Sequence, residues 1–139
     1  ATAGESFGDG RYEVDVKFVD GPLDNAGGIV LMFDEDAFYF FALRGDGNGL
    51  IARCADGCVD FTMLGNQGWF ATDADWGVNS QNRMRVEADA GELSCYVNNG
   101  LVATVTDDTY KEGDVGVLVA SGAEGQAHFE FDNILVVDE

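Results

Sequence analysis

Two tryptophans and two aspartates lie close together in a long stretch of the sequence that shows no strand pattern, residues 65–81. They are Trp69, Asp73, Asp75 and Trp76. An indole ring can stack on the apolar face of a sugar, and a carboxylate can accept hydrogen bonds from sugar hydroxyls. Because long loops on a β scaffold often carry binding surfaces, we expect these four residues to contact a ligand. The alternative role for the two tryptophans is packing in the core.

A second set of carboxylates has the chemistry of a calcium site. Asp34 and Asp36 lie in a short acidic turn between two apolar runs. Together with backbone carbonyls, or with Asp73 or Asp75, they would supply the oxygen ligands that calcium requires. Calcium is therefore the one cofactor that the sequence suggests, with Asp34 and Asp36 as candidate ligands.

Three cysteines allow one disulfide within the chain. Cys54 and Cys58 enclose only Ala-Asp-Gly, and a bridge between them would close a small loop at the end of a strand. We expect this bridge, which leaves Cys95 as a buried thiol in a strand. The alternatives are a bridge from Cys95 to one of the pair and a disulfide between two chains. A zinc half-site at Cys54 and Cys58 is disfavoured, because the only histidine, His128, lies far away in the sequence.

The sequence offers no clear set of groups for nucleophilic catalysis. His128 alternates with Phe129 and Phe131 in a predicted strand, which favours a structural role, and no Gly-x-Ser-x-Gly motif occurs. The tripeptide Arg44-Gly45-Asp46 matches an adhesion motif. Three-residue matches are common by chance, and a strand that ends in a turn explains this one better.

The elements that would position these residues are β-strands. Residues 29–33 and 38–43 are nearly continuous apolar runs, which predicts central strands covered on both faces. Asn99-Gly100 lies between two alternating runs and predicts a tight hairpin with positive φ angles at these two residues. The strands we predict are 12–19, 29–33, 38–43, 50–53, 59–64, 83–88, 93–97, 101–106, 115–120 and 127–137. Since no window of useful length has a helical apolar period, the chain should form an all-β sandwich or barrel.

Length and charge restrict the classes of partner. The 139 residues suit a single domain that covers 1–139. The chain carries 26 acidic and 7 basic residues, a formal net charge of -19, which repels nucleic acids and anionic membranes. The acidic residues are scattered through turns, which is typical of a solubilising surface. No apolar run approaches the roughly 18 residues of a membrane helix, so we expect no membrane insertion.

A family resemblance runs along nearly the whole chain. It is carried by the segments Tyr12–Phe18, Gly28–Phe33, Phe38–Phe41, Asn82–Glu87, Tyr96–Gly100, Gly113–Val117 and Phe131–Ile134. In this order they resemble bacterial extracellular domains of the concanavalin A-like lectin/glucanase superfamily, in its laminin-G-like branch. The resemblance implies an antiparallel jelly-roll β-sandwich. It implies no single activity, because the superfamily includes sugar-binding modules, glycosidases, adhesion domains and structural domains.

The resemblance also bears on catalysis. Retaining β-glucanases of this superfamily carry Glu-x-Asp-x-Glu on one strand, and this chain matches the motif at Glu13 and Asp15. The third position, that of the acid/base, is Lys17. An ammonium group near its usual pKa cannot readily protonate a glycosidic oxygen and then act as a base at neutral pH. We therefore expect a solvated outer strand face here, and no enzyme.

The N-terminal region departs from the family pattern. Relatives have a further strand or two before the segment equivalent to residues 12–19, whereas residues 1–10 of this chain are poor in strand formers. If an N-terminal strand is lacking, the final strand, residues 129–137, leaves an open apolar edge that would support self-association. The chain begins Ala1-Thr2-Ala3, as a mature secreted product or an excised piece would, so we expect an extracellular or cell-surface location.

The function that best fits these observations is a non-catalytic extracellular binding module. Its expected partner is a polysaccharide or another extracellular ligand. The alternative is a self-assembling structural subunit of an extracellular filament, sheath or surface layer.

Overall fold

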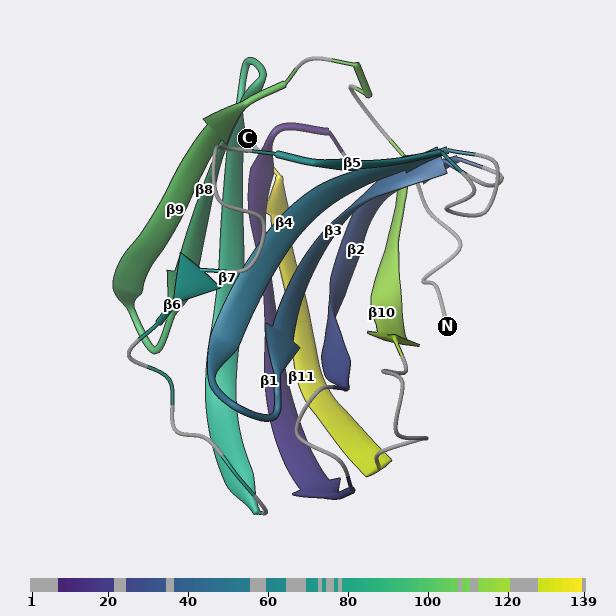
Figure 1. Cartoon of the computed structure of the whole chain (residues 1–139). Coiled ribbons are helices and arrows are strands. Elements are labelled where there is room, and N and C mark those ends of the chain that lie inside the picture. The colour runs from purple at the N-terminus through teal and green to yellow at the C-terminus, as the bar shows by residue number, and fades with distance from the viewer. Residues whose placement is uncertain are drawn as a thin grey trace.

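The computed structural model describes residues 8–21, 25–34, 37–55, 60–64, 70–72, 74, 77, 79–107, 109–110, 113–120 and 128–138. These residues form two antiparallel sheets packed face to face (Figure 1). The strands are β1 (Gly10–Asp20), β2 (Ala26–Asp34), β3 (Ala37–Arg44), β4 (Asn48–Ala55), β5 (Asp60–Met63), β6 (Phe70–Ala71), β7 (Ser80–Asp89), β8 (Glu92–Val97), β9 (Gly100–Thr106), β10 (Asp114–Ala120) and β11 (His128–Asp138). Among the described residues no helix is long and apolar enough to cross a membrane. The predicted all-β sandwich is confirmed.

The five-stranded sheet has the order β11-β1-β7-β8-β9. Its strand β1 alternates strictly, with Tyr12, Val14, Val16 and Phe18 buried and the residues between them more exposed. Strand β7 matches this pattern, because its register places the buried Met84 opposite Val14. One face of the sheet therefore enters the core, and the other carries polar and charged side chains.

The six-stranded sheet has the order β10-β2-β3-β4-β5, with β6 paired to β4. Alternate residues of its central strands enter two different clusters. Ile29 and Phe41 lie in the core between the sheets, whereas Val30 and Phe40 belong to a second buried cluster on the other face. This arrangement confirms the prediction that the two apolar runs form central strands covered on both faces.

The β8–β9 hairpin turns one residue earlier than the sequence predicted. Its two loop residues are Asn98 and Asn99, with φ angles of 51° and 70°, and Gly100 is the first residue of β9, opposite Val97. Asparagine tolerates this left-handed conformation, and here the Asn98 side chain also anchors the turn. Its Oδ1 accepts a hydrogen bond from the Arg83 backbone N–H at 2.8 Å, and its Nδ2 donates to the Asn82 side chain at 2.8 Å.

A polar cluster at one end of the sandwich ties the two sheets together. Asp107, just after β9, accepts hydrogen bonds from the Tyr39 hydroxyl at 2.5 Å and from the Arg53 guanidinium. Tyr110 donates its backbone N–H to the Tyr39 hydroxyl at 3.1 Å and its own hydroxyl to the Cys54 carbonyl at 2.9 Å. Burial alone would raise the pKa of Asp107, but the hydrogen bonds from Tyr39 and Thr109 and the charge of Arg53 lower it overall.

The cysteines differ in environment. Cys54 is disulfide-bonded, and Cys95 is a buried free thiol whose pKa is raised by burial. Cys58 lies outside the described residues, so the Cys54–Cys58 pairing stays a prediction. Residues 1–7 also lie outside them, so the absence of an N-terminal strand likewise remains a prediction.

We predict that Asp107→Asn lowers the free energy of unfolding by about 2 kcal/mol at neutral pH, because the charge that pairs with Arg53 is lost and one of the two acceptor oxygens is replaced by a donor. The depressed pKa of Asp107 stabilises the fold above its unfolded pKa of about 3.9, and this contribution disappears as the pH falls through the folded pKa. The difference between wild type and variant should therefore shrink below about pH 4. Urea unfolding at several pH values measures it, with Asp89→Asn at the exposed end of β7 as the control. A difference that does not change with pH would contradict this role.

We also predict that Cys95 resists a thiol reagent in the native protein and reacts at least about 100-fold faster in denaturant, because it is buried and its pKa is raised. A chain unfolded without reductant should show one reactive thiol, and a reduced chain should show three. Rapid reaction of the native protein would contradict the burial, and a different thiol count would contradict the predicted pairing.

Candidate functional site

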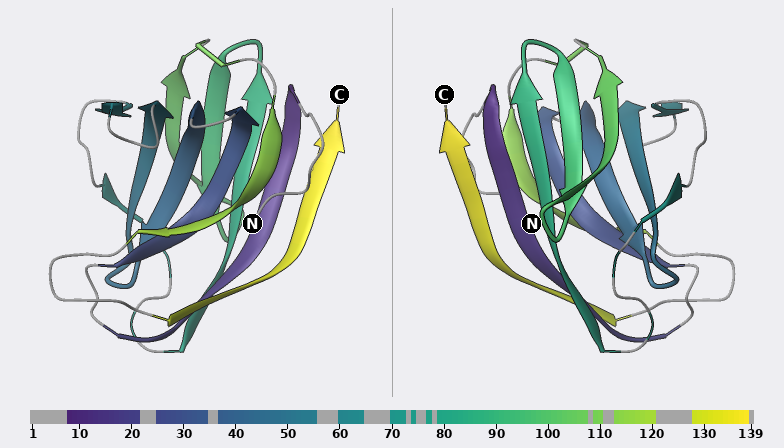
Figure 2. Two further views of the ribbon diagram at one scale, coloured as in Figure 1. Left: turned by 90° about the vertical axis from the view of Figure 1, so that its right-hand side faces the viewer. Right: turned by 90° about the vertical axis from the view of Figure 1, so that its left-hand side faces the viewer.

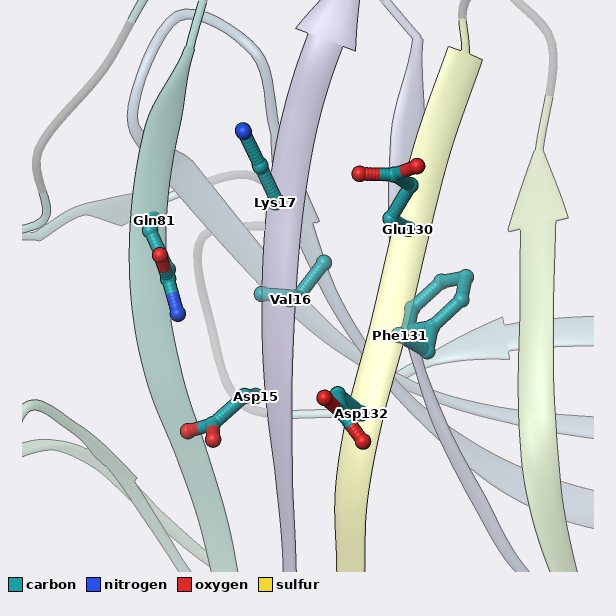
Figure 3. Close-up of a pocket in the computed structure, with 7 residues that line it drawn as sticks. All are labelled: Asp15, Val16, Lys17, Gln81, Glu130, Phe131 and Asp132. Carbon is teal, nitrogen blue, oxygen red and sulfur yellow. The ribbon is translucent and has the colours of Figure 1, made fainter.

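A hollow of about 540 Å³ lies on the outer face of the five-stranded sheet, over β1, β7 and β11 (Figure 3). It is lined by Asp15, Val16, Lys17, Gln81, Glu130, Phe131 and Asp132. Strand register explains the grouping, because Lys17 lies opposite both Gln81 and Glu130, and Asp15 lies opposite Asp132. Residues more than a hundred positions apart in the sequence therefore present polar groups to one surface.

Asp15 is held in place by two donors. The Asn133 side chain donates to its Oδ2 at 2.8 Å, and Nη1 of Arg83 lies 3.1 Å from its Oδ1. The hydrogen bond from Asn133 lowers the pKa of Asp15, and Arg83 lowers it further, against a smaller opposing effect of burial. Asp15 is thus an ionised acceptor with a fixed position, and it is poorly suited to donate a proton.

A β-bulge in β11 places Asn133 where it can reach Asp15. The register with β1 shifts between Glu13 and Asp15, and Asn133 has a φ of 55°. This left-handed conformation suits asparagine better than most other residues. The carbonyl of Asn133 also accepts a hydrogen bond from Nη1 of Arg83 at 3.0 Å, so the bulge and the guanidinium fix each other.

Glu13 lies beside the hollow and is neutralised by two arginines. Its Oε2 is 2.8 Å from Nε of Arg11, and its Oε1 is 3.3 Å from Nε of Arg83. The Glu13 side chain is only 13% exposed, so both ion pairs are partly shielded from water. The two carboxylates that match a glucanase motif are therefore held in ion pairs, and Lys17 occupies the third position.

The remaining groups of the hollow are open to a ligand. Lys17 and Gln81 make no side-chain hydrogen bond or ion pair with any described residue. From the described residues, Asp132 accepts only the backbone N–H of Asn133, at 2.8 Å, and the Glu130 carboxylate lies 3.9 Å from Nε2 of His128. In Figure 3 the carboxylates of Glu130 and Asp132 lean toward β1. Donors and acceptors thus alternate over a few strands, which is the pattern that sugar hydroxyls require.

Further along the same face, an aromatic ring is covered by an arginine. The Arg85 guanidinium lies 4.1 Å from the centre of the Tyr96 ring, and Nη1 of Arg85 donates to the Asn99 side chain at 3.1 Å. Nε of Arg85 is 3.0 Å from Oε2 of Glu87, an ion pair without the geometry of a hydrogen bond. The contact between Arg85 and the Tyr96 ring stabilises the outer face next to the hollow.

The ligand and calcium residues that the sequence predicts lie outside the part of the chain that the structure describes. The side chains of Trp69, Asp73, Asp75 and Trp76 lie outside the described residues, as do Asp36 and the side chain of Asp34, which ends β2. Their roles in ligand and calcium binding therefore stay predictions. Within the described part of the chain, no three His, Cys, Asp or Glu residues are grouped so as to hold a metal ion.

Sequence reasoning treated Glu13, Asp15 and Lys17 as a solvated strand face and overlooked the hollow. The available signal was the alternation of charges on two strands, because Glu13-x-Asp15 faces Arg83-x-Arg85 in an antiparallel pair. No sequence pattern indicates that Glu130 and Asp132 of β11 join this surface, because their register with β1 depends on the bulge.

Comparisons with known proteins identify the fold. No family model and no curated protein matches the sequence. Among solved structures, the carbohydrate-binding module CBM66 from Bacillus subtilis superposes with a TM-score of 0.77 and 21% identity, over 94% of this chain and 76% of that one. The Caenorhabditis elegans galectin LEC-6 gives 0.60 and 15%, over 93% and 84% of the two chains.

An endo-β-galactosidase from Clostridium perfringens that releases GlcNAcα1-4Gal has a TM-score of 0.64 and 14% identity. It covers 96% of this chain, but this chain spans only 39% of the enzyme. At these identities the likeness concerns the fold. The chain has the jelly-roll sandwich fold of the concanavalin A-like lectins.

Proposed function

We propose that this chain is a non-catalytic carbohydrate-binding module that acts outside the cell. The observation that carries the proposal is the hollow over β1, β7 and β11, in which a fixed acceptor, Asp15, stands beside Lys17 and Gln81, whose side chains bond to no other described residue. Preset polar groups of this kind recognise hydroxyls without a large ordering cost. Carbohydrate-binding modules and galectins with this fold support the same conclusion.

The charge of the hollow favours one class of glycan. Asp15, Glu130 and Asp132 are acidic, and Lys17 is the one basic residue that lines it. The chain as a whole carries a net charge of -19. Anionic polysaccharides are therefore repelled, and we propose neutral sugars as ligands.

Two further observations support a non-catalytic, extracellular role. The pKa of Asp15 is lowered, so this carboxyl is ionised at neutral pH and cannot serve as a general acid. Cys54 is disulfide-bonded, and such bonds persist in oxidising compartments. The loop residues Trp69, Asp73, Asp75 and Trp76 would extend the binding surface, and calcium at Asp34 and Asp36 would order the turn after β2.

We predict that Asp132→Ala and Lys17→Ala each weaken binding to a neutral glycan about tenfold, because each removes one side chain that faces the ligand. A glycan array identifies the ligand, and calorimetry gives the dissociation constants. Glu92→Ala, at an exposed position on β8, is the control and should bind like wild type.

The same experiment can contradict the proposal in two ways. If no neutral glycan binds, the proposed function is wrong. If Trp69→Ala or Trp76→Ala abolishes binding while Asp132→Ala and Lys17→Ala leave it unchanged, the site lies in the loop 65–81 and the hollow has no part in it.

We predict that calcium raises the melting temperature relative to a chelator, since a ligand at 100 times its dissociation constant stabilises a fold by about 2.7 kcal/mol. Asp34→Asn should abolish the shift, and Asp89→Asn should preserve it. Identical melting temperatures of the wild type in calcium and in chelator would contradict the calcium site.

A further inference from the structure

The outer face of β11 changes its chemistry at the bulge. Before the bulge, Glu130 and Asp132 line the hollow. After it the strand is apolar, and no charged residue occurs between Asp132 and Asp138. Figure 2 shows β11, in yellow, at the end of the five-stranded sheet and beside β1, in purple. The hollow therefore borders an apolar segment of one of its own strands.

The bulge decides which residues of this segment turn outward. Residues that face each other in an antiparallel pair point to the same side of the sheet. Asp132 lies opposite Asp15, and Leu135 lies opposite Glu13. Asp15 and Glu13 are successive residues of the outer face of β1. Leu135 is therefore the next outer-face residue of β11 after Asp132, because the bulge inserts one extra residue between them.

Leu135 and Val137 form a short aliphatic strip on this face. Val137 lies opposite Arg11, whereas Val136 between them lies opposite the buried Tyr12 and packs against the core. Leu135 and Val137 expose 42% and 41% of their surfaces. Their side chains stand about 7 Å apart, the spacing of two residues along a strand. The aliphatic strip thus continues the outer face of β11 directly beyond the hollow.

The aliphatic strip differs from the rest of the surface around it. The outer-face residues of the two neighbouring strands, β1 and β7, are all polar or charged: Arg11, Glu13, Asp15, Lys17, Gln81, Arg83, Arg85 and Glu87. Natural sheets usually place charges on an exposed end strand, and this chain has 26 acidic residues from which to do so. Exposed apolar groups beside a polar hollow suit a ligand that has both polar and apolar surfaces.

A sugar chain has both kinds of surface. Hydroxyls project from the edge of each ring, and the faces of the ring carry C–H groups that pack on apolar side chains. The polar groups of the hollow can bond the hydroxyls of one unit while the strip contacts the C–H face of the units that follow. Arg11 lies opposite Val137 and pairs with Glu13 through Nε, but its side chain is 45% exposed and offers further donors to hydroxyls.

We propose that the ligand is an extended neutral glycan chain, which occupies the hollow and continues along β11 over Leu135 and Val137. This inference rests on the proposed function and adds the class of ligand, a linear oligosaccharide or polysaccharide. From Glu130 to Val137 the strand covers roughly 20 Å, a length that only several linked sugar units can span. A neutral chain is also not repelled by the net charge of -19.

Calorimetry with a disaccharide and with longer oligomers of the same neutral sugar tests the proposal. The wild type should bind the longest oligomer at least about tenfold more tightly than the disaccharide, because the added units gain contacts on the strip. Leu135→Asn should remove this gain and leave disaccharide binding unchanged, since Leu135 does not line the hollow. Val137→Thr keeps the shape of the side chain but adds a hydroxyl, so it should remove part of the gain.

The matched control is Leu101→Asn. Leu101 is 58% exposed and lies on the same outer face, because it is opposite Tyr96, which is opposite Arg85. It stands on β9, at the other end of the sheet, so this variant should keep the full gain with chain length. Both asparagine variants should melt like the wild type, because the replaced side chains are exposed.

The possible failures are distinguishable. Equal affinity for short and long oligomers, or a gain that survives Leu135→Asn, would overturn the extended site and leave the hollow as a site for a single sugar. Two copies of the protein on one oligomer in sedimentation velocity would also overturn it, since the gain would then come from multivalency. Absence of binding at every chain length would show that the proposed function itself is wrong, and this inference with it.

Discussion

The structure depends on the position of β1 between β7 and β11, with one fixed register on each side. Four of its side chains, from Tyr12 to Phe18, enter the core, and two of the three between them, Asp15 and Lys17, line the hollow. Because side chains alternate with a period of two, a slip by one residue would expose the aromatic groups and bury the charges. Core packing and site geometry are therefore set by the same pairing.

Strand β11 has two halves with different surfaces, separated by the bulge at Asn133. Before the bulge, Glu130 and Asp132 face the hollow. After it, Ile134, Leu135 and Val137 are exposed on the strand that ends the sheet among the described residues. The hydrogen bonds that join Asn133 to Asp15 and Arg83 hold the bulge in place, so the bulge also fixes the position of Asp15 in the hollow.

The sequence was sufficient for ten of the eleven described strands, for the sandwich and for the covered central strands, because these follow from local alternation and apolar runs. It did not predict β6, which lies in the segment without a strand pattern. It was insufficient where distant segments meet. The hollow depends on pairings such as Lys17 with Glu130, and the cluster at Asp107 depends on an aspartate that follows β9 and reaches Tyr39. The hairpin turn was placed one residue late, because Asn98 and Asn99 both adopt the conformation that was assigned to glycine. In the segment 65–81, the four residues predicted to bind a ligand lie outside the described residues.

The proposed function requires that the outer face of the five-stranded sheet binds neutral carbohydrate. The most direct measurement is a titration of the ¹⁵N-labelled protein with a neutral glycan, followed through its backbone amide shifts. We expect the largest shifts at residues 15–17, at Gln81 and at residues 130–132, on three adjacent strands. Shifts confined to the six-stranded sheet, or to the loop 65–81, would contradict it.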